Sequence, residues 1–202
     1  MFLLLVSTGM RVGECLVLDY TKDIDLEKGQ IYITKTQTRD KSGKIIIGDT
    51  TKTYAGTRTI NLNSISQKYL EYAYQHKVAN ENNLLFCNKN KKMYSEGAVN
   101  SAIRRIAKKL NIGTYTDLNK EGKAVTKTNV HTHMLRGTFA TRCAEAKVDK
   151  SVLQKILGHK DNDVTDKYYI GVDTAFEKRE NNSLENYLND NHIFNTEEIK
   201  TS

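Results

Sequence analysis

The sequence has no proline among its 202 residues, although proline makes up about 5% of an average protein. Cysteine is also scarce: Cys15, Cys87 and Cys143 are far apart and odd in number. This spacing fits neither a metal site nor a disulfide framework, so we expect a reducing, cytoplasmic environment. No apolar run is long enough to cross a membrane. The run at residues 2–6 is too short for a signal peptide and is typical of the end of a buried helix, which suggests a piece of a longer protein.

Positive charge, in contrast, is in excess. The formal net charge is +7 and the sequence pI is about 9.2. Hydrophobic residues make up 38% and charged residues 27%, an ordinary composition for a globular chain. Since a basic surplus favours polyanionic partners, we expect nucleic acid first, although many basic proteins bind none.

Apolar periodicity predicts a mostly helical chain with one β-rich region. Helices are expected at residues 1–8, 11–18, 64–79, 95–110, 133–146, 149–157 and about 174–188, with a short one around the tyrosines at 168 and 169. Gly9 ends the first helix and Ser64 is the expected cap of the third. The inward face of the fourth is expected to carry Ala98, Ile103 (or Ala102), Ile106 and Leu110. Strands are expected at residues 30–38, 44–53 and 57–62. Residues 114–128 are polar and predicted to be irregular. The expected fold class is α+β, mostly α-helical, with one small antiparallel β-sheet in a single domain.

The segment "HTHMLRGTFATR" places His133 and Arg136 three residues apart, on one face of a helix. A fixed guanidinium beside an imidazole suits a phosphate, because arginine binds oxygens in a fork and histidine moves protons near neutral pH. A solvated helix face with a capping histidine is the alternative.

The segment "STGMRVGE" places Arg11 in the first turn of a helix, after a turn at Gly9. Unpaired backbone N–H groups make such an end attractive to anions. Glu14, three residues further on, could hold the arginine side chain. A local Arg–Glu surface pair is the alternative.

Lys52 precedes a turn between two expected strands, in "TTKTYAGTRTI". A hairpin lysine could reach a substrate as a proton donor, or it could simply be solvated. Lys35, in the similar segment "ITKTQT", is a rival for the same role.

The segment "LGHKDNDVTDKYY" ends one helix at Gly158 and offers N-caps for the next. On that next helix Tyr168 shares a face with Val164, and Tyr169 shares another with Thr165. One tyrosine is therefore expected in the core and the other exposed, and periodicity does not decide which.

Taken in order, these segments resemble the tyrosine recombinase (phage integrase) family. The family pattern is an arginine after a Thr-Gly turn, a hairpin lysine, a His-x-x-Arg box, a Leu-Gly-His, and a tyrosine nine residues beyond. The matching residues here are Arg11, Lys52, His133, Arg136, His159 and Tyr168. The resemblance runs from residue 2 to about 172, and the lysine is its least specific match.

The resemblance implies that the Tyr168 hydroxyl attacks a DNA phosphate, giving a 3′-phosphotyrosyl link and a free 5′-hydroxyl without ATP, metal or other cofactor. Arg11 and Arg136 would clamp the non-bridging oxygens. Lys52 would protonate the leaving oxygen, His133 would help to take the tyrosine proton, and His159 would hydrogen-bond the phosphate.

The resemblance also implies a domain division. Residues 1–172 would be the catalytic domain, without the amino-terminal DNA-clamping domain of full-length members. Residues 173–202 would be a C-terminal helix and tail, either docking on a neighbour or packing on its own domain. The missing clamping domain is one departure from the family pattern, and Gly137, where the family often has histidine, is another.

The implied partners are double-stranded DNA, further copies in a homo-tetramer on paired sites, and accessory bending or excision factors, with no membrane. The implied setting is the bacterial cytoplasm and nucleoid, in the service of a phage, transposon or conjugative element. A type IB topoisomerase and a non-catalytic DNA-binding relative are the alternatives.

Overall fold

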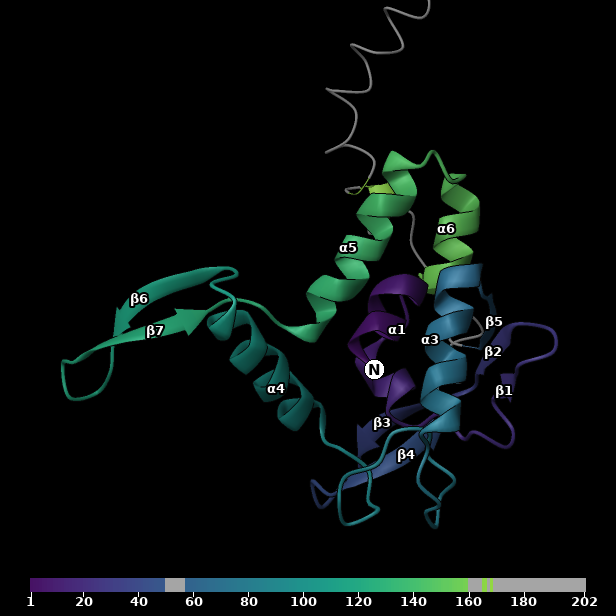
Figure 1. The fold of residues 1–202 in the computed structure, drawn as a ribbon, viewed down its shortest axis with the longest axis horizontal. Helices are drawn as coiled ribbons and strands as arrows, with labels where there is room; N and C mark the ends of the chain where they lie inside the picture. The colour runs from purple at the N-terminus through teal and green to yellow at the C-terminus, as the bar shows by residue number, and fades with distance from the viewer. Residues whose placement is uncertain (50–56, 160–164, 167, 169–202) are drawn as a thin grey trace, which may run out of the picture.

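The computed structural model describes residues 1–49, 57–159, 165–166 and 168. Helix α1 (Phe2–Thr8) lies at the centre of the main body, beside α3 (Ser64–Gln75) and α5 (Thr132–Glu145) (Figure 1). It forms because Leu4 and Leu5 are almost completely buried in the main core. It ends as predicted at Gly9, whose φ of 67° is a left-handed conformation that glycine adopts without a steric penalty.

The strands of the β-rich region form two separate sheets. Strands β1 (Ile24–Asp25), β2 (Gln30–Ile33) and β5 (Arg58–Asn61) pair antiparallel in the order β1-β2-β5. Strands β3 (Lys35–Arg39) and β4 (Ile45–Asp49) form an antiparallel hairpin. The expected strand at residues 30–38 is therefore two strands, because pairing passes from β5 to β4 at Thr34.

Among the strands that the structure describes, those of the three-stranded sheet supply the buried residues of the main core. Ile31, Ile33 and Ile60 alternate with more exposed residues and face the same apolar cluster as α1. In β3 every residue is partly or fully exposed, so this hairpin lies at the rim of the body. With the hairpin described next, the described residues contain three small sheets, so the expectation of one sheet is wrong, while the α+β, mostly helical fold class is confirmed.

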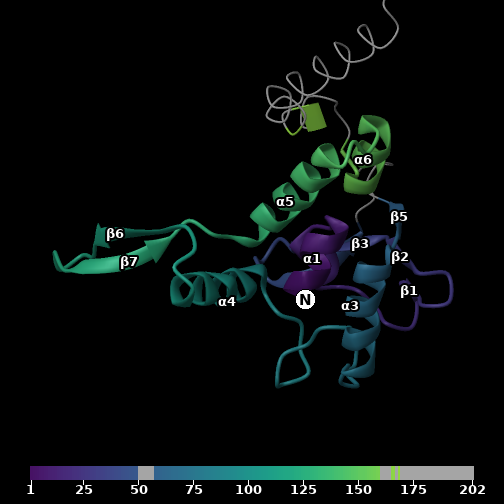
Figure 2. The same cartoon turned by 45° about the horizontal axis from the view of Figure 1, so that its top comes forward.

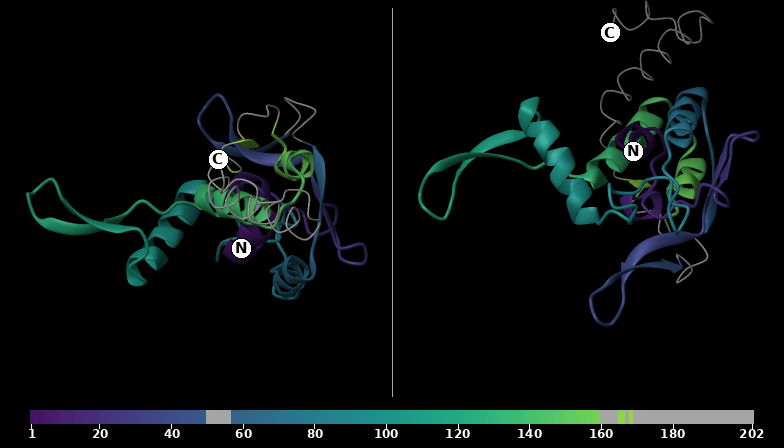
Figure 3. Two further views of the ribbon diagram at one scale, coloured as in Figure 1. Left: turned by 90° about the horizontal axis from the view of Figure 1, so that it is seen from above. Right: turned by 60° about the horizontal axis from the view of Figure 1, so that its bottom comes forward.

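The sequence predicted residues 114–128 to be irregular. They form instead a hairpin of β6 (Thr114–Leu118) and β7 (Ala124–Thr128). The hairpin follows α4 (Glu96–Lys109) and extends away from the body, as Figure 1, Figure 2 and the two views of Figure 3 all show. Its turn is local: the Asn119 side chain accepts from the N–H groups of Glu121 and Lys123.

Two details of the helices also differ from prediction. The N-cap of α3 is Asn63, whose side-chain oxygen accepts from the N–H groups of Ile65 and Ser66, and not Ser64. On α4 the buried residues are Val99, Ile103 and Ala107, so Ile103 is inward as predicted, whereas Ala98, Ile106 and Leu110 are exposed. The packed face of α4 is thus rotated from the one predicted.

The helices of the last third agree with prediction. Helix α6 (Lys150–Leu157) packs against α5 through a second apolar cluster of Ala140, Leu153 and Leu157, and Tyr168 packs on this cluster. Residues 165, 166 and 168 are helical, as predicted for the tyrosine segment. The expected helix at about 174–188 and the tail 173–202 lie outside the described residues. Within the described part of the chain, no helix combines the length and apolarity that a membrane span requires.

Candidate active site

Arg136 is a buried guanidinium that joins three helices. It projects from α5 with 3% of its surface exposed. Its Nη1 donates to the carbonyl oxygen of Gly9 (2.7 Å) and its Nη2 to that of Leu157 (2.5 Å). Burial, helped by the cation of Arg11, lowers the pKa of Arg136 to about 9, so the group stays charged at neutral pH. Arg136 thus ties the turn after α1 to the end of α6.

Arg11 lies at the N-cap of α2 (Val12–Cys15) and is oriented by Glu14, as the sequence suggested. Its Nη1 donates to Glu14 Oε1 (2.9 Å) and its backbone N–H to Glu14 Oε2 (2.8 Å). Its Nη2 lies 3.4 Å from the carbonyl oxygen of Gly158. The alternative of a local surface pair is wrong for Glu14, whose side chain is only 2% exposed, although the Arg11 side chain is 41% exposed.

A third arginine, Arg58, completes this cluster. It begins β5, is buried with Ile60 on the inward face of the strand, and donates from Nη1 and Nη2 to the two oxygens of Glu14 (2.9 and 2.8 Å). Its Nε donates to the carbonyl oxygen of Ile156 (2.6 Å). Burial by itself would raise the pKa of Glu14, but the hydrogen bonds and charges of Arg58 and Arg11 outweigh it and lower that pKa. The carboxylate is therefore ionised inside the protein.

His159 follows directly on the end of α6. It is partly buried, and its Nδ1 lies 3.0 Å from the hydroxyl oxygen of Thr165. Burial and the nearby cations of Arg136, Arg11 and Arg58 lower the pKa of His159 to about 4. The imidazole is thus neutral at physiological pH. His133, on an exposed position of α5, adds to this lowering, which places it in the same electrostatic environment.

Tyr168 lies over α5 next to the arginine cluster. A Cβ atom placed on Gly137 would be 3.9 Å from both Cε1 and the hydroxyl oxygen of Tyr168. The ring is partly buried against the α5–α6 cluster, and its charged form would stabilise the Arg136 cation. The tyrosine hydroxyl therefore lies beside the residue that follows Arg136.

Two predicted candidates are not placed by the structure. Lys52 and Tyr169 lie outside the described residues. The rival lysine, Lys35, is described: its Nζ makes an ion pair with Asp23 (3.1 Å), and 28% of its side chain is exposed. Lys35 is thus held by a carboxylate at the start of β3.

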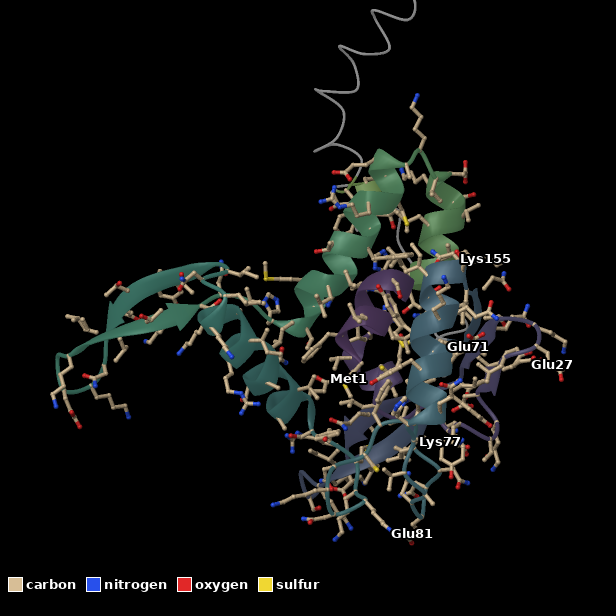
Figure 4. The ribbon with its side chains drawn as sticks, in the orientation of Figure 1. Met1, Glu27, Glu71, Lys77, Glu81 and Lys155 are labelled. Atoms are coloured by element: carbon tan, nitrogen blue, oxygen red, sulfur yellow. The ribbon has the colours of Figure 1, made fainter. Side chains whose placement is uncertain are left out.

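A groove of about 540 Å³ opens between β5 and α6 at this cluster. Thr57 and Thr59 line one wall, and Gln154 and His159 the other. Lys155, labelled in Figure 4, lies at the groove on α6. Cations and neutral donors surround it, so the groove suits an anion such as a phosphate. No cluster of three or more histidine, cysteine or acidic side chains suited to a metal ion occurs among the residues that the structure describes.

The sequence prediction missed Arg58 and gave no role to Thr165. Only Arg58 carried a signal. Arg58 and Ile60 are two residues apart in a strand, so they share its buried face, and a buried arginine requires an anionic partner. Thr165 follows His159 by six residues, a spacing that no helical or strand periodicity singles out, so its contact with His159 could not be predicted from the sequence.

Comparisons with known proteins agree on one family. The model of the phage integrase family matches residues 1–175. The integrase of Staphylococcus phage L54a is 29% identical over 187 residues, covering 88% of this chain and 49% of the relative. The chain thus spans about half the length of this curated relative.

Solved structures show the same fold. An integrase of transposon Tn1549, in complex with circular intermediate DNA, superposes with a TM-score of 0.69 at 25% identity, covering 83% of this chain and 53% of that one. XerA recombinase superposes with a TM-score of 0.63 at 24% identity, covering 90% and 56% of the two chains.

Proposed function

Because the chain belongs to the phage integrase family, we propose that its residues 1–172 form the catalytic domain of a site-specific DNA recombinase. The enzyme cleaves and rejoins double-stranded DNA through a 3′-phosphotyrosyl intermediate, in the integration and excision of a bacterial mobile element. The integrase names of its relatives support this role. We further propose that copies act as a tetramer on paired DNA sites, with accessory bending or excision factors, and that residues 173–202 are a C-terminal tail.

One observation carries the proposal. Arg11 and Arg136 come from different helices and donate to the successive carbonyl oxygens of Gly158 and Leu157, directly before His159. Two cations and a neutral imidazole are thereby brought together beside the ring of Tyr168. A group of this composition is suited to the negative charge that develops on a phosphate as it is attacked.

In the proposed cleavage step the hydroxyl oxygen of Tyr168 attacks phosphorus and the bond from phosphorus to the 5′-oxygen breaks. His133 helps to accept the tyrosine proton, and Lys52 donates a proton to the leaving oxygen. Arg11 and Arg136 bind the non-bridging oxygens, and His159 donates a hydrogen bond to one of them. Among the described residues, Arg136 donates to Gly9 and Leu157, and three of its five N–H groups remain for this purpose.

The surface of α4 and the β6–β7 hairpin supports DNA as the substrate. A groove of about 680 Å³ between them, here called the α4–hairpin groove, is lined by four basic side chains without an acidic one: Arg104, Arg105, Lys108 and Lys127. Basic side chains concentrated in a groove neutralise backbone phosphates and release counterions. We propose that the duplex extends from the arginine cluster along this groove.

The test is covalent trapping on a nicked suicide duplex that carries the junction sequence of the mobile element encoding the chain. The parent protein is compared with Tyr168→Phe and with Tyr169→Phe as the matched control. Loss of the protein–DNA adduct with Tyr168→Phe alone is the expected result. Loss with Tyr169→Phe alone would keep the enzyme and reassign the nucleophile.

No adduct from the parent protein on this substrate would refute the catalytic function and favour a DNA-binding relative without the chemistry. Strand exchange between two duplexes is then measured with the active protein. Relaxation of supercoiled DNA without strand exchange would point instead to a topoisomerase-like activity.

A further inference from the structure

Three arginines converge on three successive carbonyl groups at the end of α6. Arg58 donates to Ile156 (2.6 Å), Arg136 to Leu157 (2.5 Å) and Arg11 approaches Gly158 (3.4 Å). The last carbonyls of a helix lack partners within the helix and form the negative end of its dipole. This end of α6 therefore gathers cations from β5, α5 and the N-cap of α2.

Of these three arginines, Arg58 has no part in the proposed chemistry: it lines the groove between β5 and α6, but its guanidinium is turned to partners inside the protein. Its side chain is 4% exposed, and its Nε, Nη1 and Nη2 atoms all have partners inside the protein. Arg11, in contrast, is 41% exposed and shares the same carboxylate, Glu14. Arg58 thus acts on the site through Glu14 and not by contact.

The charge of Glu14 explains why two arginines are needed. A carboxylate paired with Arg11 alone would orient that arginine but would also cancel its charge toward a bound anion. Arg58 binds the same carboxylate through a bidentate fork, the strongest form of this pair. Three guanidinium groups and one carboxylate then leave two positive charges in the cluster.

We propose that Arg58 is a positioning residue that supplies the counter-charge of Glu14, so that Arg11 is held in place and its own charge remains for a phosphate. The inference rests on the proposed function for the identity of the phosphate as part of DNA. It differs from a purely structural ion pair, which would stabilise the fold without affecting anion binding.

The test compares three variants with the parent chain: Arg58→Lys, Arg58→Met, and the double variant Arg58→Met with Glu14→Gln. Arg142→Met is the matched control, because Arg142 also pairs with a glutamate (2.6 Å) but at the exposed surface of α5. Each protein is titrated with inorganic phosphate while the side-chain N–H signals of its arginines are followed by NMR. Thermal unfolding is recorded alongside.

Arg58→Met is expected to weaken phosphate binding about tenfold, the effect of one nearby charge being cancelled. The double variant is expected to recover most of this loss, because neutral glutamine no longer competes for Arg11. Arg58→Lys keeps the charge without the fork, so its affinity for phosphate is expected to lie between those of the parent and Arg58→Met. The control is expected to bind phosphate as the parent does.

Recovery in the double variant is the decisive result, since a merely structural pair predicts no recovery of phosphate binding when its second member is also removed. If Arg58→Met does not fold, Arg58→Lys and the double variant still decide. Phosphate binding at least tenfold weaker in Arg58→Lys than in the parent, although the charge is kept, or a double variant that folds and still binds phosphate about tenfold more weakly than the parent, would overturn the inference.

The adduct assay is run on the same proteins and separates the two proposals. A parent that binds phosphate in an Arg58-dependent manner but forms no adduct would refute the enzyme and keep this inference. A parent that forms the adduct, with phosphate binding and adduct formation unchanged in Arg58→Met, would keep the enzyme and refute the inference.

Discussion

The Nδ1 atom of His159 lies 3.0 Å from the hydroxyl oxygen of Thr165, a completely buried side chain three residues before Tyr168. Because His159 is neutral at pH 7, only one of its ring nitrogens carries a proton. To donate to a phosphate from Nε2, the imidazole must accept at Nδ1, and the threonine hydroxyl can donate there. Thr165 therefore links the tautomer of the histidine to the helix that carries the tyrosine.

We expect Thr165→Val to slow adduct formation about fivefold to tenfold, the effect of losing one hydrogen bond of roughly 1 kcal/mol. Thr165→Ser retains the hydroxyl and is expected to stay close to the parent rate. The nitrogen chemical shifts of the His159 ring report its tautomer directly. An unchanged tautomer and rate in Thr165→Val would show that the contact has no role in orienting the imidazole.

The lowered pKa of His159 predicts an acid-sensitive fold. The group titrates near 6.5 in the unfolded chain and at about 4 in the folded one, so the unfolded state binds more protons between these values. The free energy of unfolding should therefore fall as the pH decreases from 6.5 toward 4. The carboxyl groups of lowered pKa, such as Glu14, begin from ordinary values of 4.5 or below and act mainly at lower pH.

Urea unfolding at pH 7 and pH 5 measures this effect in the parent and in His159→Gln, which cannot titrate. The variant is expected to lose less stability than the parent between the two pH values. Equal losses in both proteins would mean that the folded and unfolded states protonate His159 alike.

The elements that the sequence predicted well are those whose signal is local. Gly9 ends α1 because its conformation is left-handed, and the apolar spacing of α6 places Leu153 and Leu157 inward. The pairing of Arg11 with Glu14 was likewise foreseeable, because three residues separate the two on one helical turn. Each of these follows from neighbours within a few positions.

The elements that were missed depend on distant partners. The β6–β7 hairpin has almost no buried side chain, so no apolar alternation marks its strands, although Asn119 and Gly122 form its turn. On α4, Val99 and Ile103 are buried but Ile106 is exposed, so hydrophobicity alone does not define the buried face of this helix. Arg58 meets Glu14 across 44 residues and Ile156 across 98, which no local pattern encodes.

Replacing either of two glycines near the arginine cluster by alanine is expected to change the free energy of unfolding, but in opposite directions. Gly9 has a φ of +67°, and a Cβ there would lie 2.3 Å from Cδ1 of Phe139. Gly9→Ala should therefore lower the free energy of unfolding by about 2–4 kcal/mol, through backbone strain and overpacking. At Gly137, inside α5, the nearest atoms of Tyr168 are 3.9 Å away, an ordinary contact.

Gly137→Ala should accordingly raise the free energy of unfolding by about 0.5–1 kcal/mol, since alanine loses less backbone entropy in a helix. Urea denaturation of both variants checks the pair, each serving as the control for the other. A destabilised Gly137→Ala would indicate that the Tyr168 ring lies closer to α5 than the described contact.

The α4–hairpin groove predicts a defined change in the salt dependence of DNA binding. Arg105 and Lys108 line the groove, and changing both to glutamine removes two cations without altering the apolar face of α4. Each phosphate contact contributes about −0.9 to the slope of log K against log salt, so the slope should become shallower by about 2. Binding of a duplex of arbitrary sequence, measured at several salt concentrations, gives this slope.

The matched control changes Lys28 and Lys68 to glutamine, which removes the same charge from two exposed positions, one between β1 and β2 and one on α3. Figure 1 shows these elements on the side of the body away from α4 and the β6–β7 hairpin. If the two double variants change the slope equally, binding depends on net charge alone and the groove is not the DNA surface. A shallower slope confined to the groove variant would instead place backbone phosphates against α4, because the two proteins carry identical net charge and differ only in where that charge was removed.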